Sequence, residues 1–517
     1  MGPSGPVRGG AVAEAVVGSA GSLNPLFAEE DNAREVDSLI YQGLTAVDSR
    51  QLVVPLLAAS VNVSDDQLAY VIRLRTDVRW ADGRPFGQDD VLFTYRLLQN
   101  PAYNQPDAQF WREVKIEAVG DASVRFTLKA PSSSFPLDLR LGIIPAHVFQ
   151  GMAIGAIAAD VHSRTRAFGT GPFEVQSISQ DRKLVTLKRN PNARPQPLLD
   201  RFQFRSYASP ADALDAVSRG EADLVGALQA PQIEALAKRP DLTIHELRTF
   251  GLVAILFNLS QDLSPYLNPP AVRQALNQAI DRGKIISSIL GGHADPAPGP
   301  IPPTDWAYDP VPNDRYRYDP AAAAKTLDDA GWVVPTGGGV RARAGRDLSL
   351  TLSTPDAYPY KQVAEEVARQ LVAVGVQAKV ETVPASVLVG RMLLQHQFQM
   401  AAVAFDNGPD PDQYSLWHSG PATDTLNFAS VLTPRQALID KDLEDGRTAS
   451  DRPTRLKAYS DFQDLMAEAA PAIFLYEPHY FYVSSKRVKG FTSNQVIEPA
   501  DRFEFVTSWY VPKGSAT

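Results

Sequence analysis

The chain has 517 residues, of which 44% are hydrophobic and 21% charged, the balance of an ordinary globular protein. This length exceeds what one hydrophobic core supports, so roughly two or three compact parts are expected. The formal net charge of −9 offers no basic stripe for phosphates and argues against nucleic-acid binding. With no cysteine, the chain cannot form disulfides, thiolate nucleophiles or cysteine-type zinc sites.

The N-terminal sequence does not have the layout of a signal peptide, because Glu14 interrupts its first apolar stretch, residues 10–17. The opening Met-Gly-Pro-Ser-Gly-Pro is typical of a mature start or an added leader, so an export signal is expected to be absent from this chain. No stretch reaches the roughly 18 apolar residues of a membrane span. Membrane attachment is therefore expected only through an anchor that is not visible here.

The first elements are predicted from apolar periodicity. Residues 11–17 read as a strand and residues 32–43 as a helix closed by glycine. Alternating apolar residues predict half-buried antiparallel strands at 68–74 and 124–128. A helix at 89–98, with acidic residues in its first turn, separates them. This block is predicted to form a separate α+β subdomain.

Helix start and stop signals then recur along the chain. A capping residue and a proline at the start, with a closing glycine, mark successive helices. Their start signals are Ser209-Pro210, Asn268-Pro269, Asp281 and Asp319-Pro320. Short apolar strands at 202–204, 224–225 and 242–247 alternate with helices at 210–219 and 231–238. This alternation predicts a first α/β layer.

A second α/β layer is predicted between residues 348 and 405. Strands at 348–352, 376–380 and 400–405 alternate with helices at 363–374 and 386–394. The β-α-β-α-β order implies parallel strands joined by right-handed crossovers. The predicted organisation is two α/β layers and an inserted subdomain.

The loop after the strand at 400–405 is a candidate ligand site. It contains three carboxylates, Asp406, Asp410 and Asp412, and Tyr414 and Trp417 follow closely. Ligands of open α/β sheets bind beyond the carboxyl ends of the strands, where this loop would lie. The alternative is a solvated turn in which the acids cap a short helix. We expect that capping role for Asp410 and Asp412.

Searches for catalytic signatures give no cofactor or metal site. The seven histidines are scattered, without an H-E-x-x-H pattern, and no phosphate-binding glycine loop or G-x-S-x-G elbow occurs. We expect no cofactor and no metal. Asp406 and Asp410 could form the acid/base pair of a glycosidase, although acids paired on a turn are more often caps. A glycosidase or a peptidase therefore stays as the alternative from a different functional class.

Several stretches carry a family resemblance in the right order along nearly the whole chain. They are Leu74–Val91, Pro55–Ser60, Gly169–Phe173, Val272–Arg282, Gly299–Pro303, Asp328–Trp332 and Asp410–Ser419. Together they resemble the extracellular solute-binding proteins of family 5, which are the dipeptide-, oligopeptide- and nickel-binding receptors of ABC importers. The resemblance is specific for the family and not for the ligand.

The resemblance implies a two-lobe α/β fold of the type II periplasmic-binding-protein kind (cluster C), with an α+β subdomain inserted in lobe I. Lobe I would combine residues 1–47, 168–257 and 485–517. The inserted subdomain would span 48–167, and lobe II would span 258–484. The loop that follows the strand at 400–405 would then face the ligand.

The resemblance also implies a non-enzymatic, extracytoplasmic receptor, in the periplasm or on the outer face of the cell membrane. It would deliver peptides to the permease of an ABC importer, and we expect a monomer. In peptide-binding members an aspartate in this loop pairs with the α-amine of the peptide, and Asp406 matches that pattern if Pro409 is an insertion. The other candidate ligand-binding residues are Asn407, Asp410, Trp417, Trp306, Tyr360, Phe27 and Asn24. An oligosaccharide receptor is the alternative within the family, and a nickel-chelate receptor is a further one.

Overall fold

The computed structural model describes most of the chain as two compact units. The described residues are 5–48, 50–105, 107–260, 262–420, 426–427 and 435–512, without the side chains of Asn313 and Arg391, so the opening residues 1–4 lie outside them. Unit 1 comprises Met1–Leu247 and Tyr480–Thr517, and unit 2 comprises Arg248–His479. The chain therefore passes between the units twice.

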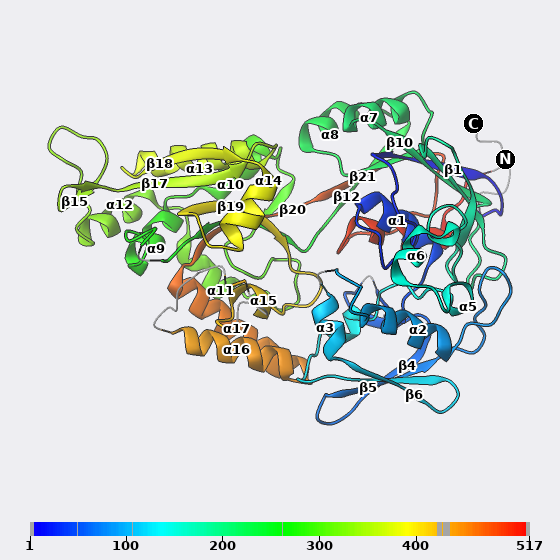
Figure 1. The fold of residues 1–517 in the computed structure, drawn as a ribbon. Coiled ribbons are helices and arrows are strands. Elements are labelled where there is room, and N and C mark those ends of the chain that lie inside the picture. Colours follow the sequence, from blue (N-terminus) through cyan, green and yellow to red (C-terminus); the bar gives the residue numbers. More distant parts are fainter. Residues whose placement is uncertain are drawn as a thin grey trace. The chain divides into compact units, whose positions relative to one another are not determined.

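Unit 1 is built on a seven-stranded sheet in the order β12-β21-β11-β1-β10-β9-β8 (Figure 1). The strands are β1 (Ala11–Val17), β8 (Phe173–Ile178), β9 (Leu184–Arg189), β10 (Arg201–Tyr207), β11 (Leu224–Gly226), β12 (Leu242–Leu247) and β21 (Tyr480–Ser485). β1 pairs in parallel with both β10 and β11. The predicted strand at 11–17 is confirmed, and it lies at the centre of the sheet.

Helices α1 (Asp31–Ile40), α7 (Pro210–Ser218) and α8 (Ala230–Leu236) belong to the same unit. The predicted start of α7 is confirmed, because Ser209 Oγ accepts a hydrogen bond from the Asp212 amide at 3.2 Å. Ala213 of α7 and Ile233 of α8 pack in one apolar cluster with Ala15 of β1. These two helices therefore cover one face of the sheet.

The predicted α+β block forms a second sheet in unit 1, antiparallel and in the order β4-β5-β7-β6. Its elements, with the short β2–β3 pair before it, are β2 (Thr45–Val47), β3 (Val53–Pro55), β4 (Ala58–Val63), β5 (Ala69–Leu74), β6 (Lys115–Val119), β7 (Ser123–Thr127), α2 (Gln88–Leu98), α3 (Ala108–Glu113), α4 (Phe135–Asp138), α5 (Ala146–Phe149) and α6 (Ile154–Ala159). Its core is continuous with that of the seven-stranded sheet. The boundaries 48–167 of an inserted subdomain stay a prediction.

The stretch Leu74–Val91 has a structural role in this block. The Trp80 indole donates a hydrogen bond to Asp90 Oδ2 at 3.1 Å, and the Gly87 amide donates to the same oxygen at 3.0 Å. Asp90 Oδ1 accepts from the Ala146 amide at 2.9 Å. Asp90 thus fixes the start of α2 against two other segments, which explains the tryptophan and the aspartate of this motif by folding.

A buried charge network joins the two ends of the chain in unit 1. Arg502, in the short 3₁₀ helix Pro499–Phe503, lies 2.5 Å from Glu14 and 2.8 Å from Glu35, and the hydroxyl of Tyr482 donates to Glu14 at 3.0 Å. Burial raises the pKa of Glu14 to about 7 against the opposing charge of Arg502. Losing one member would leave a buried charge unpaired, so this network fixes the C-terminal segment to β1 and α1.

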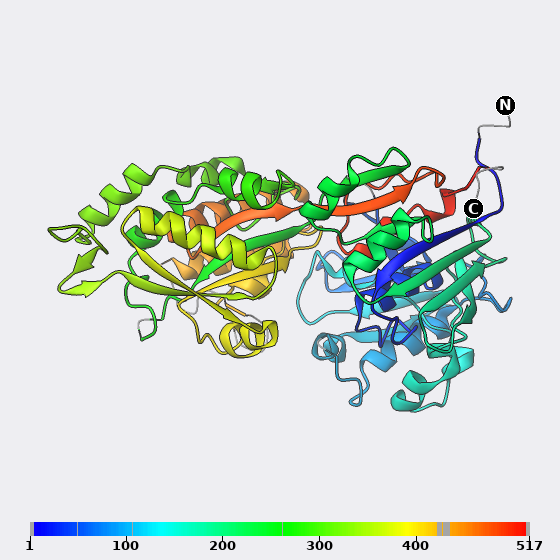
Figure 2. The same cartoon turned by 90° about the horizontal axis from the view of Figure 1, so that it is seen from above.

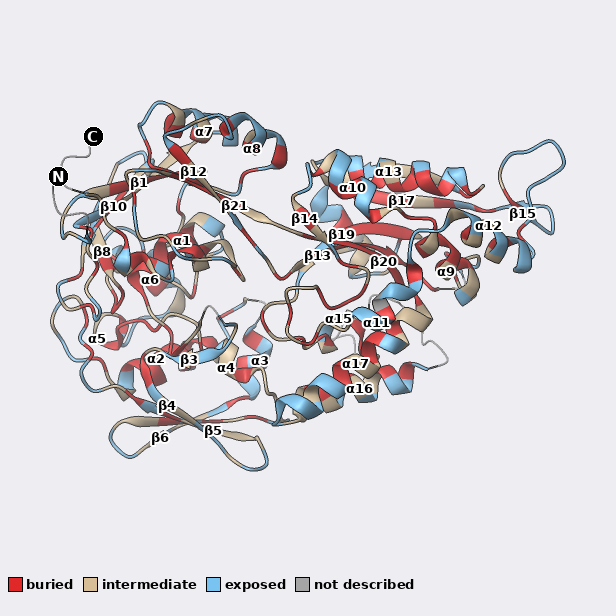
Figure 3. Cartoon of the chain, turned by 180° about the vertical axis from the view of Figure 1, so that it is seen from behind, coloured by how far each residue is buried: buried red, intermediate tan, exposed pale blue. Residues whose placement is uncertain are grey.

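Unit 2 is built on a six-stranded sheet in the order β14-β20-β13-β19-β17-β18, and the strands near its centre are buried (Figure 3). The strands are β13 (Gly251–Phe257), β14 (Ala294–Pro296), β17 (Ser349–Pro355), β18 (Gln377–Val383), β19 (Met400–Asp406) and β20 (Ala472–Pro478). β17 pairs in parallel with β18 and with β19. The predicted parallel β-α-β-α-β segment is confirmed.

The central strand β13 is apolar on both faces. Leu252, Ala254 and Leu256 pack in one cluster, and Val253 and Ile255 pack in the cluster on the opposite face. This double burial explains its continuous apolar sequence. The resemblance predicted that 257–258 and 484–485 would be the crossings between lobes. In the structure β13 pairs with β19 and β20, so unit 2 already begins at Arg248, and it ends at His479.

Helices cover both faces of this sheet, and α13 packs on β17 and β18 (Figure 2). The helices are α9 (Pro270–Gln278), α10 (Arg282–Ile289), α11 (Pro310–Asn313), α12 (Pro320–Asp329), α13 (Tyr360–Ala373), α14 (Ala385–Val387), α15 (Tyr414–Trp417), α16 (Gln436–Thr448) and α17 (Arg452–Ala469), with a π-helical turn at Leu388–Leu393 and the small hairpin β15 (Ala342–Arg343) and β16 (Arg346–Asp347). The predicted caps of α10 and α12 are confirmed, because Asp281 and Asp319 accept hydrogen bonds from amides in the first turn.

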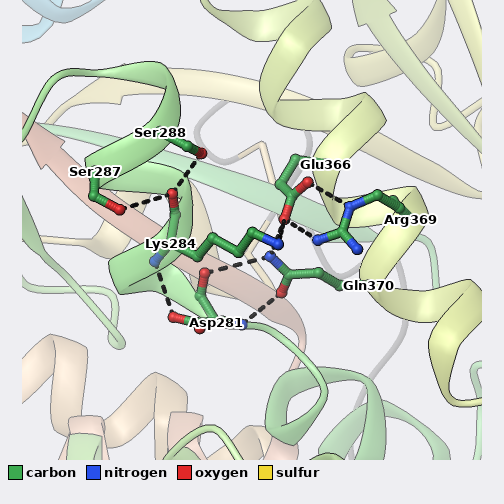
Figure 4. A network of polar contacts seen from close by, with 7 residues as sticks. All are labelled: Asp281, Lys284, Ser287, Ser288, Glu366, Arg369 and Gln370. Carbon is green, nitrogen blue, oxygen red and sulfur yellow. Dashed lines mark hydrogen bonds and ion pairs between the residues drawn. The ribbon is translucent and has the colours of Figure 1, made fainter.

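A polar network ties α10 to α13 on the surface of unit 2 (Figure 4). Gln370 accepts a hydrogen bond from the Asp281 amide at 2.6 Å and donates to Glu366 at 2.8 Å. Glu366 is also bound at 2.5 Å by Arg369, and Lys284 lies 3.7 Å away. The bond from Arg369 is the largest cause that lowers the pKa of Glu366 to about 2. Glu366 is therefore ionised throughout the neutral range.

Candidate functional site

The carboxyl ends of four strands meet at one edge of the sheet in unit 2. β17, β18 and β19 are parallel, and β20 has the same direction because both β19 and β20 are antiparallel to β13. Asp406, the last residue of β19, pairs with Gly251, the first residue of β13. This edge is where an open α/β sheet binds its ligands. The predicted position of the loop 406–412 at such an edge is confirmed.

Asp406 presents its carboxylate at this edge. The residue is exposed, and its Oδ1 accepts a hydrogen bond from the Gly408 amide at 3.1 Å. Gly408 has a φ of +64°, which a glycine adopts without strain. This tight turn directs the chain away from the strand while the acid stays accessible to a ligand.

Asn407 connects the loop to two neighbouring segments. Its amide donates to the Phe250 carbonyl at 3.1 Å, and its side-chain Nδ2 donates to the Pro300 carbonyl at 3.2 Å. Its buried Oδ1 has no hydrogen-bond partner within the described part of the chain. The side chain of Asn407 thus joins the loop to the proline-rich segment that contains Pro300.

Asp410 and Asp412 each form an ion pair with an arginine from a helix that follows the loop in the chain. Arg455 of α17 lies 2.6 Å from Asp410, and Arg447 of α16 lies 2.9 Å from Asp412. Asp410 also accepts from the Asp412 amide at 3.1 Å, and Asp412 accepts from the Tyr414 amide at 3.0 Å. Both acids therefore bind backbone amides of the turn, as predicted, although the N-cap residue of α15 is Gln413 and not one of the aspartates. Sequence analysis missed the two arginines, because each lies about 35 to 45 residues from its partner in a segment without a distinctive motif.

A fourth acid, Asp305, lies near the same loop and was not predicted. It is 4% exposed, its Oδ1 accepts from the Ala307 amide at 2.8 Å, and its Oδ2 has no hydrogen-bond partner among the described residues. Burial is the main cause that raises its pKa to about 8, and the charge of Asp410 adds to the shift. Asp305 is therefore mostly protonated at neutral pH.

The predicted aromatic residues of unit 2 fall into different environments. Trp306 is half-buried, with the guanidinium of Arg452 at 4.5 Å from its ring centre. Tyr360 is half-buried at the start of α13, just after the carboxyl end of β17. Trp417 is 2% exposed, donates to Gln413 at 3.2 Å and belongs to the core. We therefore correct the prediction that Trp417 is a ligand-binding residue, because other residues of unit 2 cover its ring.

The two predicted site residues of unit 1 also differ in access. Asn24 is fully buried, and its side chain is bonded to Ser163 Oγ at 2.9 Å and to the Leu26 amide at 3.1 Å. This side chain supports the loop after β1 instead of facing a ligand, which is a second correction. Phe27 is half-buried and forms an edge contact with Tyr103, so part of its ring is accessible. The chain brings six predicted residues into unit 2 and leaves Asn24 and Phe27 in unit 1.

The family model described as bacterial extracellular solute-binding proteins, family 5 Middle, matches residues 53–426. The chain belongs to this family. This family 5 protein is 27% identical over 496 residues to the oligopeptide-binding protein AppA of Bacillus subtilis (strain 168), with 94% of this chain and 89% of that protein covered. It is 27% identical over 484 residues to di/tripeptide-binding protein 2 of Pseudomonas aeruginosa (strain UCBPP-PA14). That match covers 87% of this chain and 86% of that protein.

A solved structure of the Bacillus subtilis AppA protein, in complex with a nonapeptide, matches the family 5 protein with a TM-score of 0.76 and 26% identity. The match covers 98% of this chain and 100% of that chain. Family membership confirms the predicted two-lobe α/β fold, the extracytoplasmic class and the role of a binding receptor instead of an enzyme. No helix in the described part of the chain has the length and apolar character that crossing a membrane requires.

The hydrolase alternative is thereby set aside. The family and its named relatives are binding proteins. Asp410 is also a poor catalytic group, because it is ion-paired with Arg455 and bonded to the Asp412 amide. An acid/base pair needs one carboxyl group that gains and loses a proton near the substrate. Asp406 alone does not supply such a pair.

Proposed function

We propose that this protein captures peptides outside the cytoplasm and delivers them to the permease of an ABC importer. One observation carries the proposal: an exposed carboxylate, Asp406, lies at the ligand-binding edge of a sheet in a chain that resembles an oligopeptide-binding protein over nearly its whole length. We further propose that the protein acts as a monomer in the periplasm or on the outer face of the cell membrane.

Asp406 would bind the α-ammonium group of the peptide. A charged amine that leaves water for a closed site needs an opposite charge, because an unpaired buried ion is very unfavourable. Asp410 and Asp412 are largely buried and bound by arginines, and Asp406 is exposed at the end of β19. The exposure of Asp406 and its place at the carboxyl edge of the sheet support this role.

Apolar and aromatic surfaces would accept varied side chains. Trp306 and Tyr360 in unit 2 and Phe27 in unit 1 are half-buried, so each keeps part of its ring accessible. The main chain of an extended peptide can supply affinity through hydrogen bonds that do not depend on its side chains. The accessible aromatic surfaces would then accept peptides with different side chains. Receptors for oligosaccharides or nickel chelates stay as alternatives, and the following experiment separates them from a peptide receptor.

Isothermal calorimetry with a peptide library, in free and N-acetylated forms, tests the proposal. Removing one member of a desolvated charge pair costs about 2–5 kcal/mol, roughly 30- to several-thousand-fold in affinity. Asp406→Ala should lose affinity by this factor for peptides with a free amine. Acetylated peptides should bind poorly to the wild type and lose little more in the variant. The matched control is Asp347→Ala, an exposed acid just before the amino end of β17, which should bind like the wild type.

Equal losses for free and acetylated peptides would show that Asp406 only shapes the loop. No loss for either form would place the amine elsewhere. Binding of nickel chelates or oligosaccharides without any binding of peptides would overturn the proposed ligand class.

A further inference from the structure

The chain lies outside the strands for a few residues at each place where it leaves unit 2. In unit 1, β12 and β21 are paired up to Leu247 and Tyr480, which lie opposite each other. In unit 2, the pairing of β13 with β20 starts at Val253 and Tyr476. Between these two ladders lie the connecting segments 248–252 and 477–479, in which 251–252 pair with β19 and 477–478 pair with β14, so that 248–250 and 479 lie outside the strands. A rotation of one unit against the other breaks the fewest strand hydrogen bonds if it occurs at the residues outside the strands.

A single carboxylate binds both segments. Asp295 Oδ2 lies 2.9 Å from Arg248 Nη1 and 3.1 Å from His479 Nε2. Arg248 is the first residue of unit 2, and His479 is its last. Both residues at which unit 2 begins and ends are therefore attached to the same oxygen atom.

Asp295 is itself firmly fixed in unit 2. It is the middle residue of β14, and it lies opposite Glu477 in the antiparallel pair of β14 with β20. The Thr249 hydroxyl adds a direct link between the two segments, because it donates to the Pro478 carbonyl at 2.7 Å. The side chains of Asp295 and His479 are 28% and 13% exposed, so their interaction is less screened than a surface pair.

The charges around His479 come from three strands or their flanking residues. Asp295 of β14 and Glu477 of β20 supply two carboxyl groups, and Arg248, just before β13, supplies one positive charge. The carbonyl of His293 faces the His479 amide at 3.5 Å. Thr304 donates to Glu477 through its amide at 3.1 Å and through its hydroxyl.

We propose that Asp295 is a clamp that holds both connecting segments to unit 2 through Arg248 and His479. Asp295 is thus a positioning residue for the hinge of the receptor. The role in transport rests on the proposed function, whereas the clamp itself acts in the protein without ligand. An intact clamp restricts the motion of the connecting segments, so its loss should broaden the range of distances between the two units in the ligand-free protein.

Distance measurements between two labels in the full-length, ligand-free protein test the clamp. Because the chain has no cysteine, Asp65→Cys in unit 1 and Val372→Cys in unit 2, both exposed, give two defined label sites. The width of the distance distribution from pulsed electron resonance is compared between the wild type and the variants under the same conditions. For a partly exposed pair the expected shift between conformer populations is about two- to fivefold. The wild type should show the narrowest distribution.

Two variants and one control complete the test. Asp295→Asn, which loses the charge that binds Arg248, and His479→Ala, which loses the imidazole contact, should each give a broader distribution than the wild type. His162→Ala is the matched control, since His162 lies 2.9 Å from Asp160 in unit 1, far in sequence from the connecting segments, and it should give the wild-type distribution. An Asp295→Asn protein that behaves like the wild type would overturn the clamp. Because no ligand is used, a failure of peptide binding would leave this result unaffected.

Discussion

Arg455 of α17 and Asp410 of the loop 406–412 form an ion pair at 2.6 Å, with side chains that are 11% and 14% exposed. The two residues are separated by 45 positions, and their contact places the loop against a helix that follows it in the chain. Asp410 is thereby committed to the loop, while Asp406, four residues earlier, stays at the exposed edge. The division of work between these two acids is the basis of the proposed site.

The first prediction concerns this ion pair. Arg455→Met leaves the Asp410 carboxylate without its partner in a mostly buried place, which should lower the free energy of unfolding by about 2–4 kcal/mol. Urea denaturation measures the change. The matched control is Lys457→Met on the same helix, where an exposed lysine pairs with Asp461 at 2.6 Å, and it should cause no resolvable change. Similar effects of the two substitutions would contradict a supporting role for Arg455.

The second prediction concerns Asp305. Burial raises its pKa to about 8, so this acid lowers stability as the pH rises from its unfolded value near 4 towards 8, by at most roughly 1.4 kcal/mol per pH unit. Asp305→Asn keeps the shape and removes the titration. The variant should gain stability relative to the wild type between pH 5 and 8 in denaturation curves. A stability difference that does not vary with pH would show that Asp305 is not protonated in the folded protein.

The third prediction concerns Glu366 in the network between α10 and α13. Its pKa is lowered to about 2, chiefly by the bond from Arg369, so its stabilising effect is present above the unfolded pKa near 4.5 and is lost as the pH falls towards 2. Glu366→Gln should be less stable than the wild type at pH 7, and the difference should shrink between pH 4.5 and 2. Thermal unfolding at several pH values measures this. A difference that persists unchanged at pH 2 would contradict the assigned cause.

The fourth prediction concerns closure. Two units joined by two short segments should change their mutual arrangement when a ligand binds to both. Small-angle scattering of the protein saturated with a binding peptide should give a smaller radius of gyration than the ligand-free protein. The Asp406→Ala variant, at the same peptide concentration, should stay at the ligand-free value. An unchanged profile of the wild type with demonstrated binding would exclude closure.

Much of the fold could be predicted from the sequence because local signals agreed with the final packing. The caps Ser209, Asp281 and Asp319 start the helices that were predicted from them. The alternation of strands and helices between residues 348 and 405 correctly predicted parallel strands. It also placed Asp406 at the end of one of them. These features depend on residues that are close in the sequence.

The remaining features depend on contacts between distant residues. The apolar sequence of β13 fits the centre of either large sheet, so its membership of unit 2 could not be decided from pattern alone. The pairing of Arg502 with Glu14 spans almost the entire chain. The burial of Trp417 and Asn24 likewise depends on packing against segments whose positions the sequence does not specify.

The most direct test of the central claim is the identity of the ligand that the protein carries. The protein is purified without denaturation from its native host or after exposure to a mixed pool of peptides, oligosaccharides and nickel chelates, and the ligand released by acid is identified by mass spectrometry. A peptide receptor should release peptides with free N-termini in about equimolar amount, and Asp406→Ala, treated in the same way, should release far less. Recovery of oligosaccharides or nickel chelates in place of peptides would contradict the account.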